Sequence, residues 1–161
     1  MNGLSGRWEQ VAIGSETSEL VLIYPEKDTW LGSVSAGVSP KQKESGEMRS
    51  VRVTVRNLDY YFNDIHRGKI LIKIDVEGYE REVLKGASRV IWNRTPTIIF
   101  ESKDADTRGE LFQMLAGFGY RVYGLPWSPS CRSQSLDAHE FENSVGVNFI
   151  AAPRMELGNE L

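Results

Sequence analysis

The stretch Ile70-Leu-Ile-Lys-Ile-Asp-Val-Glu-Gly-Tyr-Glu80 decides the fold class of this chain. Its first seven residues are apolar apart from Lys73 and Asp75, which is typical of a central strand covered on both faces. Gly78 follows directly and permits a sharp turn. From Tyr79 to Ile91 the apolar residues fall on one stripe of a helix. The stretch therefore predicts a buried strand, a tight turn and a helical segment.

The segments that follow extend this unit into a sheet. Gly86 is expected to divide the helical segment into two short helices. A helix is expected over Thr107–Phe118, with Asp106 as its N-cap. Further strands are expected at Thr97–Phe100, Tyr120–Tyr123 and Val145–Ala151, the last two separated by a polar loop over Gly124–Ser144. The alternation of strands and helices predicts a right-handed parallel α/β sheet.

The segments that precede it are less regular. Arg7–Ile13 and Glu19–Tyr24 are typical of two short strands around a turn. Pro25–Glu47 is rich in Ser, Gly, Pro and Lys and is expected to be a long loop. Val51, Val53 and Val55 alternate with polar residues, which predicts a strand that buries one face. A short helix is expected over Leu58–Ile65, capped by Asn57 or Asp59.

The composition excludes several classes of protein. The 161 residues are 40% apolar and 25% charged, as in an ordinary globular domain. A net charge of −3 does not favour sequence-independent nucleic-acid binding. The single cysteine, Cys131, excludes a disulfide framework within the chain. The apolar runs are shorter than the ~20 residues that cross a bilayer, and the first residues do not resemble a signal peptide. We therefore expect a cytoplasmic protein with no membrane span.

Two acids mark the candidate site. Asp75 and Glu101 follow expected neighbouring strands, and parallel α/β sheets bind ligands at the carboxyl ends of their strands. A structural interpretation is equally good on spacing alone, with Glu77 capping the helix and Asp75 paired with Lys73 or a backbone amide. We expect pairing with Lys73 to be disfavoured, on the argument that alternate strand residues lean to opposite faces. The P-loop and Gly-x-Ser-x-Gly patterns are both absent from the sequence.

Ile72-Lys-Ile-Asp-Val-Glu-Gly-Tyr-Glu80, followed by Val83-Leu-Lys-Gly-Ala87, resembles the signature of the FkbM methyltransferase family. The similarity extends in register from Asn2 to Pro153. Its companion segments are Val55-Arg-Asn-Leu-Asp59, where asparagine replaces the family's usual threonine, Thr97-Ile-Ile-Phe-Glu101, Phe118-Gly-Tyr120 and the strand Val145–Ala152.

The resemblance implies a class I methyltransferase fold, a Rossmann-type sheet whose last strand is antiparallel. It implies a transferase that moves a methyl group from S-adenosylmethionine to a hydroxyl of a sugar, glycan or polyketide-like acceptor. Asp75 and Glu77 are then the candidate catalytic carboxylates, with Asp75 the first candidate to draw the proton from the acceptor hydroxyl. Asp75 and Glu101 are candidate oxygen ligands for Mg²⁺, and Ala12 and Ile13 would offer an apolar edge to the adenine.

Two parts of the family domain are not found in these residues: the first two strands and the glycine-rich turn that cradles the cofactor. The match begins at the third strand, so residues 1–154 are expected to form a partial domain and residues 155–161 a tail. We expect a fragment or a truncated reading frame that binds S-adenosylmethionine weakly alone and self-associates through an exposed sheet edge. The alternative is a non-catalytic remnant or interaction module.

Overall fold

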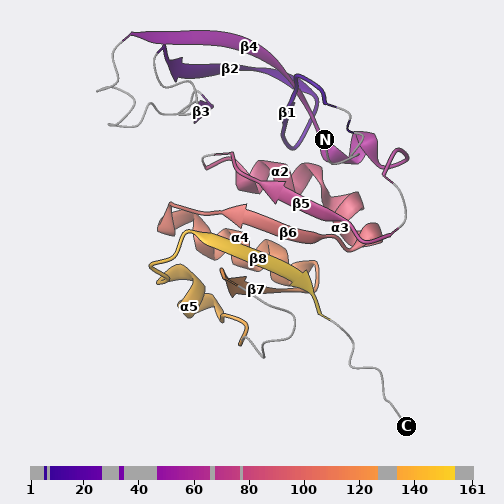
Figure 1. Ribbon diagram of the computed structural model, residues 1–161, viewed down its shortest axis with the longest axis vertical. Helices are drawn as coiled ribbons and strands as arrows, with labels where there is room; N and C mark the ends of the chain where they lie inside the picture. Colours follow the sequence, from indigo (N-terminus) through magenta and orange to yellow (C-terminus); the bar gives the residue numbers. More distant parts are fainter. Residues whose placement is uncertain are drawn as a thin grey trace, which may run out of the picture.

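The computed structural model describes residues 6, 8–26, 33–34, 47–65, 68–76, 78–126 and 134–154. Their strands form two four-stranded sheets (Figure 1). Sheet A contains β1 (Ala12–Ile13), β2 (Ser18–Pro25), β3 (Ser33–Val34) and β4 (Met48–Arg56). Sheet B contains β5 (Leu71–Ile74), β6 (Thr97–Glu101), β7 (Tyr120–Gly124) and β8 (Asn148–Pro153). The described chain is thus a mixed α/β structure.

Sheet B has the strand order β5-β6-β8-β7. β5 and β6 are parallel, and β8 is inserted antiparallel between β6 and β7. This confirms the predicted parallel strands and the antiparallel last strand. The last strand begins at Asn148 instead of Val145, whose side chain is fully exposed.

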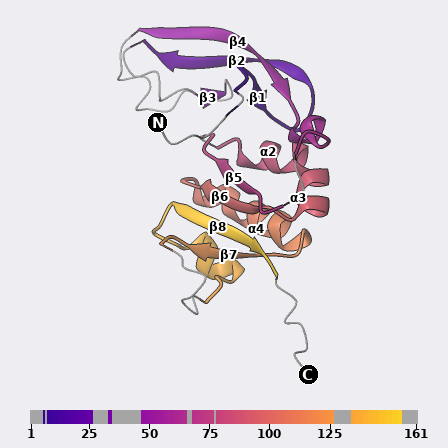
Figure 2. The ribbon, with the colours of Figure 1, turned by 45° about the vertical axis from the view of Figure 1, so that its right-hand side comes forward.

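Four α-helices accompany sheet B in the part of the chain that the structure describes. They are α2 (Glu80–Gly86), α3 (Ser88–Arg94), α4 (Ala105–Gly117) and α5 (Ala138–Glu142). Figures 1 and 2 show α2, α3 and α4 behind the strands, on one face of the sheet, and α5 packs against α4. The predicted division at Gly86 is confirmed. The N-cap of α4 is Asp104 instead of Asp106, because the Asp104 carboxylate accepts the Asp106 N–H at 3.0 Å.

The core lies between this helical layer and sheet B. Val83 and Ile91 come from the helices, and Ile98 and Phe100 from the centre of the sheet. The prediction that the Ile70–Val76 strand is covered on both faces is wrong for the described residues. β5 alternates between exposed and more buried positions, and Leu71 is 62% exposed. β5 therefore has more apolar side chains than the described residues bury.

Sheet A also differs from expectation. The first strand contains only Ala12 and Ile13, and it pairs in parallel with β4. β2 pairs antiparallel with β4, from Ser18 opposite Val55 to Pro25 opposite Met48. β1 and β2 therefore share β4 as a neighbour. Within the expected long loop, the structure describes β3, and the predicted helix after β4 is a short 3₁₀ helix, η2 (Leu58–Tyr61), capped by Asn57.

Two glycines bring sheet A against the helical layer. A Cβ atom at Gly86 would overlap the carbonyl oxygen of Gly14, directly after β1, and would lie 3.0 Å from Cβ of Asn57. Ile13 packs against the core of sheet B. α2 therefore approaches the backbone after β1 at a distance that only glycine allows.

Candidate acid cleft

Asp75 lies directly after β5, at its carboxyl end. Its Oδ2 accepts a hydrogen bond from Nζ of Lys73 at 2.5 Å, so the expectation that this pair is disfavoured is wrong. Residues two apart in a strand point to the same face, which brings the two side chains together. The Lys73 ammonium holds the pKa of Asp75 below its usual range, against the effect of partial burial, and Glu101 and Lys103 act in the same direction. Asp75 is therefore a carboxylate at neutral pH.

Glu101 ends β6, the parallel neighbour of β5. Its side chain is 22% exposed, and its Oε2 lies 3.3 Å from Nζ of Lys103. Its interaction with Asp75 contributes to the lowered pKa of that residue. The structure therefore brings Asp75 and Glu101 together at one edge of the sheet, each with a lysine from its own segment.

The turn after Asp75 forms one wall of a cleft of about 220 Å³. We call it the acid cleft; its lining residues are Gly78, Glu80, Glu101, Lys103 and Asp104. Gly78 has a φ of 91°, which favours glycine, and its N–H donates to Oε1 of Glu80 at 3.0 Å. Glu80 is only 5% exposed. Glu77, the second candidate catalytic acid, lies outside the described residues.

Arg108, in the second turn of α4, supports the far side of this cleft. The residue is 3% exposed, and its guanidinium donates to four backbone carbonyls. They belong to Ser102 (2.7 Å), Ser144 (2.6 Å), Gly146 (2.9 Å) and Phe141 (3.3 Å). Burial lowers the pKa of Arg108 from its ordinary value. Since Ser102 lies between Glu101 and Lys103, Arg108 fixes the backbone that carries both.

Glu80 and Arg108 are site residues that sequence reasoning did not find. Glu80 lies in the first turn of α2, where the helix dipole favours a negative charge, and its position two residues after Gly78 suits a bond to the turn. Arg108 has no local signal, because three of its four acceptors lie in the distant stretch 141–146.

Ala12 and Ile13, the predicted adenine edge, lie in sheet A. Ile13 lines a second cavity of about 350 Å³, whose other lining residues are Glu9, Val11, Tyr61, Asp64 and Ile65; Ala12 is not among them. On one side, Oε2 of Glu9 accepts from the Tyr61 hydroxyl at 2.5 Å and from Arg56 at 3.0 Å. The cavity therefore combines apolar and aromatic walls with carboxylates.

A metal site is not preformed in the described part of the chain. No group of three His, Cys, Asp or Glu side chains there is arranged to hold an ion. Asp75 and Glu101 supply hard oxygen donors suited to Mg²⁺, but each lies against a lysine ammonium. Ion binding at this pair would have to displace those ammonium groups.

Residues 2–122 match the methyltransferase FkbM domain. This chain belongs to the FkbM methyltransferase family. The match contains the Asp75 turn, Glu101 and Arg108, and it ends within β7. A search of curated proteins and one of solved structures each find no match. None of the helices that the structure describes is long and apolar enough to cross a membrane.

Proposed function

We propose that this FkbM-family chain takes part in S-adenosylmethionine-dependent methylation of a hydroxyl group on a sugar, glycan or polyketide-like acceptor. One observation carries the proposal. Within the segment that matches the family domain, Asp75 and Glu101 meet at the carboxyl ends of two parallel strands. That is where sheets of this kind place their ligands.

The proposed role of Asp75 is to hold the acceptor. When bound, S-adenosylmethionine supplies a methyl group with an electrophilic carbon. The acceptor oxygen has to lie in line with that carbon, so correct placement lowers much of the barrier. Asp75 is ionised and half-exposed, so its carboxylate can accept a hydrogen bond from the hydroxyl of the acceptor. Its lowered pKa makes it a weak base, which suits orienting the hydroxyl before the proton leaves.

Two further acids complete this proposal. Because the lowered pKa of Asp75 makes it a poor base, Glu77 is the proposed proton acceptor, on its place in the signature. Glu101 would hold a second hydroxyl of a polyhydroxylated acceptor, or join Asp75 as a ligand to Mg²⁺. A sugar presents adjacent hydroxyls, and two neighbouring carboxylates with their lysines match that pattern of donors and acceptors.

We further propose that residues 1–154 act as the acceptor-binding half of the domain. Among the described residues, β5 pairs only with β6 and β1 only with β4, and Leu71 of β5 is exposed. Strands carrying a glycine-rich turn would complete the sheet at these edges, with Ile13 providing an apolar wall for the adenine. We place this activity in the cytoplasm, with no nucleic-acid partner.

The alternative is a non-catalytic interaction module. The ion pairs of Asp75 and Glu101 favour it, because they occupy both acids without any ligand. The exposed edge of sheet B would then pair with another chain or another copy.

The test is transfer of labelled methyl groups from S-adenosylmethionine by the native protein to a panel of monosaccharides, oligosaccharides and macrolide alcohols. The proposal predicts a methyl ether, which survives base treatment that cleaves methyl esters. Omitting Mg²⁺ and adding a chelator separates the metal-dependent form of the proposal from the metal-free form. Label on nitrogen or carboxyl groups, or on no acceptor in the panel, would contradict O-methylation.

A further inference from the structure

Tyr79 stands between two residues that line the acid cleft, Gly78 and Glu80. Tyr79 itself is not among the described residues that line it, and its half-buried ring packs against the core. Oε1 of Glu80 accepts the Gly78 N–H at 3.0 Å, so the wall on either side of Tyr79 is one hydrogen-bonded unit. Whatever holds Tyr79 in place therefore also holds this wall of the cleft.

The ring of Tyr79 rests on Gly14, the residue directly after β1. A Cβ atom at Gly14 would lie 3.2 Å from Cε1 of Tyr79 and 3.5 Å from its hydroxyl oxygen. The same atom would lie 2.8 Å from Cγ1 of Val55, which is almost fully buried. The Gly14 N–H donates to the carbonyl of Arg56 at 3.0 Å. Gly14 is therefore a fixed backbone support, and the missing side chain lets the ring come this close.

α2 continues the contact that Tyr79 begins. Tyr79, Glu82 and Gly86 are spaced i, i+3 and i+7, so they share one face of the helix. The backbone of Gly86 lies against the Gly14 carbonyl, and the Glu82 side chain interacts with Ser15. Figures 1 and 2 both show α2 between the end of sheet A and β5. α2 therefore ties the residues after β1 to the acid cleft.

We infer that Tyr79 is a positioning residue, whose ring sets the place of the cleft wall formed by Gly78 and Glu80. The inference rests on the proposed function, because it needs an acceptor in the acid cleft. Methyl transfer requires the acceptor oxygen in line with the methyl carbon, and a misplacement of ~1 Å costs about 10²-fold in rate. Burial raises the pKa of the Tyr79 hydroxyl, so the ring packs uncharged at neutral pH.

The test compares Tyr79→Leu, which removes the ring, with Tyr79→Phe, which keeps it. Hydrogen exchange of the Gly78 amide is measured in the 161-residue chain, and kcat and KM are measured in the native methyl-transfer reaction. Tyr79→Leu should speed the exchange of Gly78 and lower kcat about 10²-fold, while the KM for the acceptor changes little. Tyr79→Phe should restore both quantities nearly to the wild type. Tyr60→Leu, which removes an exposed ring, should change neither.

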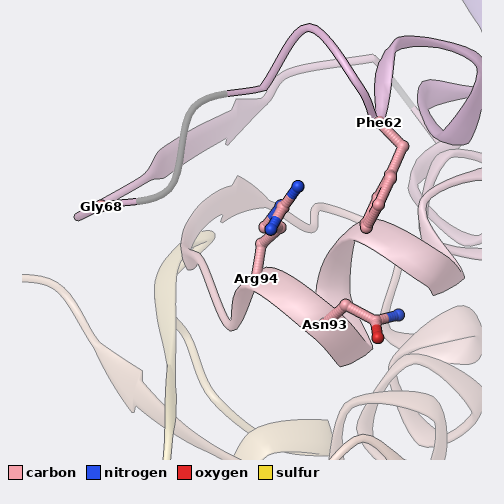
Figure 3. A pocket seen from close by; sticks show the side chains of 4 residues that line it. All are labelled: Phe62, Gly68, Asn93 and Arg94. Carbon is pink, nitrogen blue, oxygen red and sulfur yellow. The ribbon is translucent and has the colours of Figure 1, made fainter.

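A second control uses a cavity at the other end of the strands. Gly68 precedes β5 and Arg94 precedes β6, so this cavity of about 440 Å³ lies where the two parallel strands start. Its lining residues are Phe62, Gly68, Asn93 and Arg94 (Figure 3). Asn93→Ala should leave turnover and Gly78 exchange unchanged. Lost turnover in Asn93→Ala with normal turnover in Tyr79→Leu would place the acceptor in this cavity and overturn the inference.

Three other results decide the matter. Unchanged exchange of Gly78 in Tyr79→Leu, or faster exchange with an unchanged kcat, would overturn the inference. A Tyr79→Phe variant as defective as Tyr79→Leu would do the same, since the hydroxyl and not the ring would then act. If the wild type transfers no methyl group, the proposed function fails, and the exchange of Gly78 alone decides whether Tyr79 holds the cleft wall.

Discussion

Replacing Arg108 by methionine tests how the far wall of the acid cleft is held. Methionine replaces the aliphatic stem of the buried side chain but removes the guanidinium and with it every donor. Four carbonyls lose their guanidinium partner, and two of these bonds, to Ser102 and Phe141, are fully buried. The bonds to Ser144 and Gly146 are only partly buried, so water can replace them.

The expected cost follows from those two buried acceptors. Each carbonyl left without a donor costs about 1–3 kcal/mol. Methionine avoids the desolvation of a buried guanidinium, which offsets part of that loss. We expect the free energy of unfolding to fall by about 3 kcal/mol. Arg108→Lys, which keeps the charge but lacks the planar fork, should lie between the variant and the wild type.

The assay is urea denaturation followed by tryptophan fluorescence. The control is Arg121→Met, which changes an exposed arginine and should alter stability by less than about 0.5 kcal/mol. If Arg108→Met lowers stability by less than about 1 kcal/mol, the four carbonyl bonds do not hold this wall, and the reasoning is refuted.

Three further predictions concern the junction, the core and the cofactor. Gly86→Ala should destabilise the chain by about 1–3 kcal/mol or more in the same urea assay, because the new methyl group overlaps the Gly14 carbonyl; a neutral effect would contradict the close contact. The hydroxyl of Tyr120 donates to the Pro96 carbonyl at 2.7 Å, and burial raises the pKa of this hydroxyl above its ordinary value. The protonated Tyr120 therefore stabilises the folded chain fully below the unfolded pKa of ~10, and this stabilisation declines as the pH rises above that value. Tyr120→Phe should lower the free energy of unfolding by about 1–2 kcal/mol at neutral pH. Its melting temperature should then fall less steeply than that of the wild type between about pH 9 and 11, and an equal fall in both proteins would contradict this. Calorimetric titration of the 161-residue chain should show weak or no binding of S-adenosylmethionine, and micromolar affinity would refute the proposed division of the domain.

The sequence predicted sheet B more accurately than sheet A, for a physical reason. β5 and β6 and their helices are specified locally, by apolar runs, a turn glycine and a helical stripe. The pairing in sheet A depends on contacts distant in sequence, such as Ala12 opposite Val55. α5 was not predicted, because it lies in a stretch expected to be a polar loop. Asp137 and Glu140 nevertheless form a capping box whose spacing is visible in the sequence.

The candidate site was likewise predicted only where its residues are specified locally in the sequence. The positions of Asp75 and Glu101 followed from strand ends and parallel order. The Lys73 pair was misjudged by an error in strand geometry, since residues two apart share a face. Arg108 was not predictable, because three of its acceptors belong to α5 and the residues that follow it, which meet the residue after β6 only once the chain has folded around α4.

The most direct test of the central claim compares Asp75→Asn with the wild type in the native methyl-transfer reaction, measuring turnover and melting temperature together. The Lys73–Asp75 pair is exposed, so its loss should cost about 0–1 kcal/mol and barely change the melting temperature. Turnover should fall by about 10²-fold, because the acceptor hydroxyl is no longer held in line with the methyl carbon. Asp106→Asn, which changes an exposed acid on α4, should leave both unchanged. An Asp75→Asn variant that melts much lower but turns over normally below its transition would show that Asp75 is a structural residue, and would contradict the account.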